Sequence, residues 1–272
     1  VVIPSTLEYT KASSIDEAVA AVAAGAVPLS GGQSLMPMMR LRLAAPHAIV
    51  DLSGIPELVG ICEDEDEIAV GAMTIHREVA ASALIREHAG LVSDAAGGIG
   101  SPQVRNRGTI GGSLGHADPH SDMPATLVAA GASVIARGPN GERRILVEDL
   151  ITTYLTTTLE PGEIITQVRI PKSDDHSAYA KFHRRAIDWT IVGVGVCIGD
   201  DGVRAAATGV SDRPIRLSGF EEVLNGGGSI DDAIARVAEG TDPHDGLDGS
   251  VEYKRHLLGV LARRAHAEAS SR

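Results

Sequence analysis

The stretch QVRNRGTIGGSLGHADPHSD, from Gln103 to Asp122, sets arginines, histidines and aspartates among glycines. It interrupts a chain that is otherwise rich in aliphatic residues, and it shows almost no apolar periodicity. Three structures fit such a pattern: a polar surface loop, a metal site, or a loop that wraps a phosphate. The choice among them decides both the fold and the function.

The metal alternative rests on the second half of this stretch. Histidine and aspartate alternate there, at His116, Asp118, His120 and Asp122. Residues two apart share one face of a β-strand, and both residue types are common metal ligands. Gly115 and Pro119 disfavour a regular strand, however. We therefore expect no native metal ion in this chain.

The phosphate alternative rests on the glycine pair at positions 111 and 112, which follows the β-type pair Thr109-Ile110. Glycines let the backbone approach an anion closely and offer amide donors to it. Side chains nearby add polar groups suited to a nucleotide: hydroxyls on Thr109 and Ser113, and carboxylates for ribose or ribityl hydroxyls on Asp118 and Asp122.

A second glycine pair lies in PLSGGQSLMP, which begins at Pro28 and follows a short expected strand. Neither GxGxxG nor GxxxxGK[ST] is present, so the two common phosphate-loop motifs do not apply. Two Gly-Gly segments of similar chemistry could clamp the two phosphates of a dinucleotide from opposite sides. This pairing is far more specific than either segment alone.

Hydrophobic patterns predict an α+β chain with a linker after Pro171, at KSDDHS. Helices are expected over residues 13–25 (capped by Ser13 or Ser14), 74–100 (capped by Thr74), 219–225, 230–240 and 251–269. Strands are expected over residues 26–30, 47–53, 125–150 and 162–171, in a hairpin over 58–73, and as three strands within 178–217.

The composition limits the class of partner and the compartment. The 24 lysines and arginines against 36 aspartates and glutamates give a formal charge of −12, which argues against nucleic acid and against an anionic membrane surface. No run approaches the roughly 18 apolar residues of a membrane span, and the first residues lack the pattern of a signal peptide. Two distant cysteines form no disulfide framework. We expect a cytoplasmic protein.

Four segments together resemble the FAD-binding medium subunit of molybdenum hydroxylases, the family of carbon monoxide, xanthine and N-heterocycle dehydrogenases. They are PLSGGQSLMPMMRLRLAAPHAIVDLSGIPEL, GAMTIHREV, GSPQVRNRGTIGGSLGHADPHSDMPA and GEIITQVRIP. The resemblance implies a vanillyl-alcohol-oxidase-type FAD-binding fold over residues 1–171, with subdomains of about 1–55 and 56–171. A C-terminal α+β flavoprotein domain over residues 172–272 would follow.

The resemblance also implies which residues bind FAD without a covalent bond. The first loop would wrap the pyrophosphate with Pro28, Leu29, Ser30, Gly31, Gly32, Gln33, Ser34 and Leu35. A second pyrophosphate loop would comprise residues 109–113, chiefly Thr109, Gly111, Gly112 and Ser113. The remaining contacts would come from Ile99, His116, Asp118, Asp122, Ile165, Lys181 and Trp189.

Three positions depart from the family's pattern. Trp189 falls where carbon monoxide dehydrogenase-like members place a tyrosine over the flavin, so any hydrogen bond from that hydroxyl is in doubt. Gln33 stands where some members have histidine, and His116 stands where many have asparagine or alanine. The last two changes alter loop polarity without removing backbone contacts.

The resemblance implies an electron-transfer subunit with no general base or nucleophile of its own. It would take electrons from two [2Fe–2S] clusters in a small subunit, downstream of a large molybdopterin subunit, and pass them to an external acceptor. A dimer of heterotrimers is expected. Two alternatives are a stand-alone flavin oxidoreductase on the same fold, which would need acid–base groups over the flavin, and a scaffold that has lost FAD.

Overall fold

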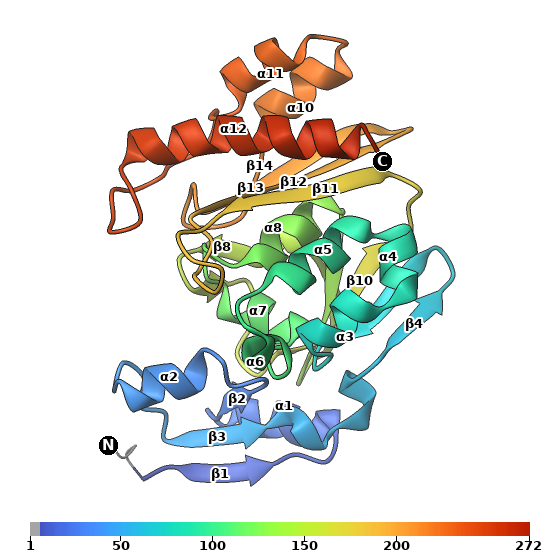
Figure 1. The fold of residues 1–272 in the computed structure, drawn as a ribbon. Helices are drawn as coiled ribbons and strands as arrows, with labels where there is room; N and C mark the ends of the chain where they lie inside the picture. The colour runs from blue at the N-terminus through green and yellow to red at the C-terminus, as the bar shows by residue number, and fades with distance from the viewer. Residues whose placement is uncertain (1–5) are drawn as a thin grey trace.

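The computed structural model describes residues 6–272 and shows an α+β protein built around three main β-sheets (Figure 1). The sheets follow one another along the chain, and the helices of the middle part lie between the second and third. The α+β class predicted from the sequence is therefore confirmed. Residues 1–5 lie outside the described residues.

The N-terminal part is a small parallel sheet of order β1-β3-β2. Ser14 caps α1 by accepting a hydrogen bond from the Glu17 amide, and Glu17 accepts one in return from the Ser13 amide. This arrangement, in which Glu17 reaches back to the residue before the cap, confirms the predicted helix start. The elements are β1 (Glu8–Lys11), α1 (Ile15–Ala23), β2 (Val27–Leu29), α2 (Leu35–Arg40), β3 (Ala48–Asp51), η1 (Leu52–Gly54) and η2 (Pro56–Leu58).

The middle part is a five-stranded antiparallel sheet of order β4-β5-β10-β6-β7. Both hairpins expected here form, β4–β5 at the acidic turn and β6–β7 at GPNG. Its strands are β4 (Ile61–Asp64), β5 (Glu67–Gly71), β6 (Ser133–Gly138), β7 (Gly141–Leu146) and β10 (Ile164–Pro171). Beside them lie α9 (Val147–Leu150) and the small hairpin of β8 (Ile151–Thr153) and β9 (Thr156–Thr157).

Three expectations for the middle part are wrong. The helical segment 74–100 is broken into α3 (His76–Ala81), α4 (Ala83–His88) and α5 (Gly90–Gly98). Thr74 caps none of them, because its hydroxyl exchanges hydrogen bonds with the backbone of Gly60. Both ends of the expected strand segment 125–150 are helical, because residues 125–129 belong to α8 (Asp122–Ala129) and residues 147–150 form α9. All eight residues of α8 are buried, so no amphipathic period marks it.

The opening polar stretch is mostly short helices rather than a loop. It contains α6 (Pro102–Arg105), α7 (Ile110–His116) and the start of α8. Thr109 is extended and pairs with Ile75 in an isolated bridge, but Ile110 already belongs to α7. The second glycine pair therefore lies in the first turn of a helix.

The C-terminal part is a four-stranded antiparallel sheet, with α12 lying across one face and α10 and α11 beyond it (Figure 1). The three expected strands form, and a short fourth strand joins their edge. The elements are β11 (His176–Phe182), β12 (Val192–Gly199), β13 (Gly202–Thr208), β14 (Ile215–Arg216), α10 (Ser218–Asn225), α11 (Ile230–Arg236) and α12 (Val251–Ala269).

The central strand β12 is shared by two hydrophobic cores. Val194 and Val196 face the core under α12, whereas Cys197 packs with the core of the middle part. Gly195 also faces that side, since a Cβ there would lie 3.0 Å from Leu91. A third, smaller core lies under the N-terminal sheet and includes Val50 and Ile164. Residues of the middle and N-terminal cores line one cavity.

Candidate functional site

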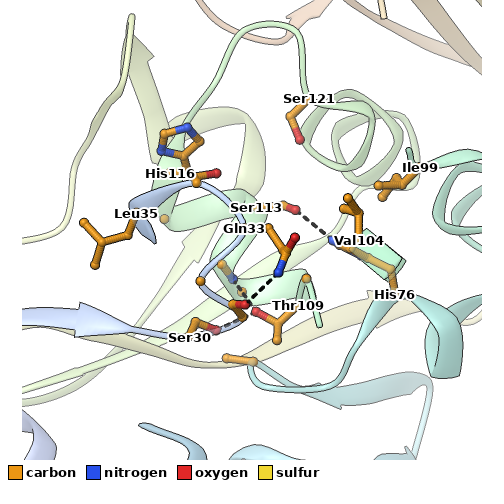
Figure 2. Close-up of a pocket in the computed structure, with 18 of the residues that line it drawn as sticks. Ser30, Gln33, Leu35, His76, Ile99, Val104, Thr109, Ser113, His116 and Ser121 are labelled. Atoms are coloured by element: carbon orange, nitrogen blue, oxygen red, sulfur yellow. Dashed lines mark hydrogen bonds between the residues drawn. The ribbon is translucent and has the colours of Figure 1, made fainter. Parts of the chain in front are cut away.

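A single cavity of about 800 Å³ joins the three parts of the chain. This volume falls in the range of pockets for cofactors and other small ligands. Its walls come from the β2–α2 segment, from α3, from the turn around α6 and α7, from β10, and from the β11–β12 connection. Figure 2 shows several of these side chains pointing toward one another.

The segment from Pro28 to Leu35 forms one wall, with every residue lining the cavity. Among residues 6–272, none accepts a hydrogen bond from the backbone N–H of Gly31, Gly32, Gln33 or Ser34. Gly31, Gly32 and Ser34 are half-buried, so their amides require a partner and are available to a ligand. Gly32 has φ +71°, a conformation that favours glycine.

Gly31 lets this wall approach the opposite one. A Cβ at Gly31 would lie 2.1 Å from the carbonyl oxygen of Arg107. The hydroxyls of Ser30 and Thr109 then meet at 2.6 Å, and Ser30 also contacts the Met73 sulfur at 2.9 Å. The two glycine-containing segments are thus joined before any ligand arrives.

The second segment presents hydroxyls rather than free amides. The Gly111 amide donates to Ala72 at 2.9 Å, and the Gly112 amide donates to the Thr109 hydroxyl at 3.1 Å. The expectation that these two glycines offer free backbone donors is therefore wrong for this conformation. Gly111 instead permits close packing, since a Cβ there would lie 2.5 Å from the Ala72 methyl.

His76 stands behind the second segment and is not among the FAD contacts expected from the sequence. It is the first residue of α3 and is 2% exposed. Its Nε2 lies 3.0 Å from the Ser113 hydroxyl, and both residues line the cavity (Figure 2). Burial lowers the pKa of His76 to about 4, so the ring is neutral near pH 7.

Asp122 is the centre of a buried polar network at the cavity wall. Its carboxylate accepts hydrogen bonds from Tyr179 at 2.5 Å, Thr190 at 2.6 Å and Lys181 at 2.9 Å. Burial and the adjacent charge of Asp122 raise the pKa of Tyr179 well above its ordinary value, which keeps the phenol a donor. The network holds β11 and the segment that leads into β12 against the start of α8.

Two predicted contacts lie outside the cavity wall. Lys181 is turned toward Asp122 and the Gly98 carbonyl, at 2.9 and 2.8 Å. Asp118 accepts a hydrogen bond from the His120 amide at 2.8 Å and lies 3.8 Å from His116. The structure therefore brings neither side chain to the surface where a ligand would sit, and Lys181 acts on that surface through Asp122.

The other predicted residues do line the cavity: Ile99, Thr109, Gly111, Gly112, Ser113, His116, Asp122, Ile165 and Trp189. Trp189 lies in the connection between β11 and β12 and is 62% exposed, so it stands at the cavity mouth. Additional lining residues carry no local sequence signal, among them Val104, Leu159, Ile164 and Thr190. They are ordinary apolar or hydroxyl residues that only the tertiary fold brings together.

The alternation of His116, Asp118, His120 and Asp122 does not form one cluster. Asp122 is turned to its three donors, and His120 Nδ1 hydrogen-bonds the Thr190 carbonyl at 2.9 Å. Over residues 6–272 no three histidine, cysteine or carboxylate side chains are grouped to hold a metal ion. Within the same range, no helix has the length and apolarity needed to cross a bilayer.

The donor set of this cavity fits a dinucleotide such as FAD. One end presents unpaired amides and hydroxyls, which suit phosphate oxygens. Two of the three carboxylates at the wall are already bound, Asp122 by its network and Glu163 by Arg143, and the third, Asp188, lies in the β11–β12 connection next to Trp189. Apolar side chains of Leu52, Ile99 and Ile165 line the remainder and suit a ring system.

Comparisons with known proteins match the chain along its length. Residues 5–173 match the family "FAD binding domain in molybdopterin dehydrogenase", and residues 177–269 match the "CO dehydrogenase flavoprotein C-terminal domain". The carbon monoxide dehydrogenase medium chain of Hydrogenophaga pseudoflava is 34% identical over 277 residues, 97% of this chain and 96% of that protein.

Two further comparisons agree. The 6-hydroxypseudooxynicotine dehydrogenase complex subunit alpha of Paenarthrobacter nicotinovorans is 33% identical, covering 99% of this chain and 96% of that protein. A solved structure of carbon monoxide dehydrogenase from H. pseudoflava superposes with a TM-score of 0.95 over 99% of both chains, at 34% identity. The predicted fold, family and FAD cofactor are confirmed, and the chain belongs to the FAD-binding medium subunits of the molybdenum-containing dehydrogenases.

Proposed function

We propose that this chain carries FAD as the electron-transfer subunit of a three-subunit molybdenum hydroxylase. The observation that carries the proposal is the cavity, in which a wall of unpaired amides at residues 31–34 faces the hydroxyls of Thr109 and Ser113. FAD, when bound, would supply the redox chemistry, and the chain would supply binding and orientation.

Electrons would arrive from two [2Fe–2S] clusters in a small subunit, which takes them from a large molybdopterin subunit that hydroxylates the substrate. They would leave to an external acceptor. The names of two relatives, "medium chain" and "complex subunit alpha", support membership of a larger assembly. A dimer of heterotrimers in the cytoplasm is the assembly we propose, and two free cysteines without a disulfide agree with that compartment.

Within this chain, residues 28–35 and 109–113 would bind the pyrophosphate. Ile99 and Ile165 would contact the flavin side, and Trp189 would cover one face of the ring from the cavity mouth. Asp122 would shape the wall rather than offer a free carboxylate, because three donors already hold it. We also propose that the chain divides into two domains, residues 1–171 and residues 172–272.

The native complex provides the test. Purification through a tag on this chain should yield a yellow assembly that contains molybdenum and iron, and denaturation should release free FAD. Reduction of the flavin by substrate should require the other chains. A colourless assembly would favour a scaffold without FAD, and an isolated chain whose flavin is reduced directly by a small substrate would favour the stand-alone oxidoreductase.

A further inference from the structure

The pair His76 and Ser113 joins two segments that are distant in sequence. His76 opens α3, and Ser113 lies in α7, with Nε2 and Oγ 3.0 Å apart. Gly108 leaves room for the imidazole ring, because a Cβ there would lie 3.0 Å from His76 Cδ2. The His76 backbone amide donates to the Gly108 carbonyl at 2.9 Å, which fixes the ring beside this turn.

The other ring nitrogen decides the direction of the hydrogen bond. His76 Nδ1 is buried and has no hydrogen-bond partner among residues 6–272. A neutral imidazole carries one proton, and a proton on Nδ1 would leave a buried N–H without an acceptor. Buried N–H groups without partners are rarer than buried acceptors without donors. The proton is therefore assigned to Nε2, which donates to the Ser113 oxygen.

This assignment determines what Ser113 offers to a ligand. Its oxygen already accepts from His76, so its own O–H is the group left to face the cavity that it lines. A hydroxyl held as a donor suits a phosphate oxygen and disfavours a ligand that presents a donor. The ring remains neutral and adds no counter-charge of its own.

We propose that His76 is a positioning residue that holds the Ser113 hydroxyl as a donor toward the diphosphate of FAD. The inference rests on the proposed function. His76 thereby couples α3 to the phosphate end of the cavity through the Ser113 hydroxyl.

A double-mutant cycle on the full chain tests the coupling, with FAD as the probe and flavin fluorescence as the measure of binding. Ser113→Ala should weaken FAD binding about tenfold, as expected for one charge-assisted hydrogen bond. His76→Met should weaken it by a similar factor. The double variant should bind no more weakly than Ser113→Ala alone, because both changes remove the same interaction.

A conservative variant distinguishes a hydrogen bond from His76 to Ser113 from a role in which the His76 side chain only fills space. His76→Gln places an amide N–H near the position of Nε2 and should recover most of the lost affinity, whereas His76→Met should not. Additive losses in the cycle, or equal losses for Gln and Met, would overturn the inference while leaving FAD binding by the unmodified chain intact. Failure of the unmodified chain to bind FAD would overturn the proposed function, and the inference with it.

Discussion

At the scale of single residues, the site is shaped by groups whose environment fixes their protonation. His76 is buried and neutral, and Tyr179 remains a donor beside a carboxylate. Neither property is visible in the sequence, because each depends on partners far along the chain. His76 and Ser113 are 37 positions apart, and Tyr179 and Asp122 are 57 apart.

The burial of His76 predicts a pH dependence of stability. Its pKa is about 4 in the folded chain against 6.5 unfolded, so the unfolded state binds more protons between these values. The contribution is complete above pH 6.5 and is lost as the pH falls toward 4. Between pH 7 and 5 the chain should lose roughly 2 kcal/mol of unfolding free energy from this group.

Urea unfolding of the apo chain at several pH values measures this loss. His76→Gln cannot titrate, so its stability should fall less steeply over the same range. Parallel curves for the two proteins would show that His76 does not contribute. The other histidines are present in both proteins and cancel in the comparison.

At the scale of elements, the sequence predicted more of the strands than of the helices near the site. The hairpins and β10 follow clear alternation or turn signals, and α1 has its serine cap. In contrast, α7 has a glycine pair in its first turn, which disfavours a helix by about 1 kcal/mol per glycine. It forms because Gly111 can lie directly against Ala72, a tertiary contact that local propensity does not include.

The start of α7 yields a prediction for the link between the two binding segments. Thr109→Ala removes the cap on Gly112 and the contact with Ser30. We expect a stability loss of about 1 kcal/mol, the usual value of a helix cap, together with weaker FAD binding. Thermal unfolding and an FAD titration measure the two effects separately.

Ser82→Ala provides the matched control. Ser82 caps α4 through the Ile85 amide and does not line the cavity. The control should lose similar stability and keep its affinity for FAD. Equal affinity in Thr109→Ala would refute the view that this cap also organises the site.

At the scale of the whole molecule, the resemblance anticipated the cavity as a meeting place of all three parts of the chain. It named nearly half of the wall, and every residue proposed to contact FAD lines the cavity except Asp118 and Lys181. The exceptions have a physical reason. Lys181 is drawn into an ion pair with Asp122, and Asp118 is used in a turn.

The Asp122 network predicts how the C-terminal sheet is held to the rest. The side chains of Lys181 and Asp122 are only 11% and 8% exposed. Asp122→Asn would leave the buried ammonium without its counter-charge, so we expect a loss of about 3 kcal/mol in unfolding free energy. Denaturant unfolding, followed by far-ultraviolet circular dichroism, measures it.

Asp94→Asn is the control, because it removes the same charge from an ion pair that is more exposed. Asp94 also links the middle part to the C-terminal part, through Arg272, but both side chains are about 40% exposed. Its loss should cost less than about 1 kcal/mol. Similar losses in the two variants would contradict the importance that we give to burial of the Asp122 network.

The double burial of β12 has a consequence for engineering. Because Gly195 faces Leu91 while Val194 and Val196 face the opposite core, this strand belongs to both sides at once. A chimera that takes its C-terminal sheet from a relative would import a surface shaped for another protein's α5 and α8. Such a transplant must carry the residues facing Gly195 with it, Leu91 and Ala129 above all. A boundary between the parts is easy to place in the sequence, but the C-terminal sheet cannot be exchanged between relatives without these matching residues.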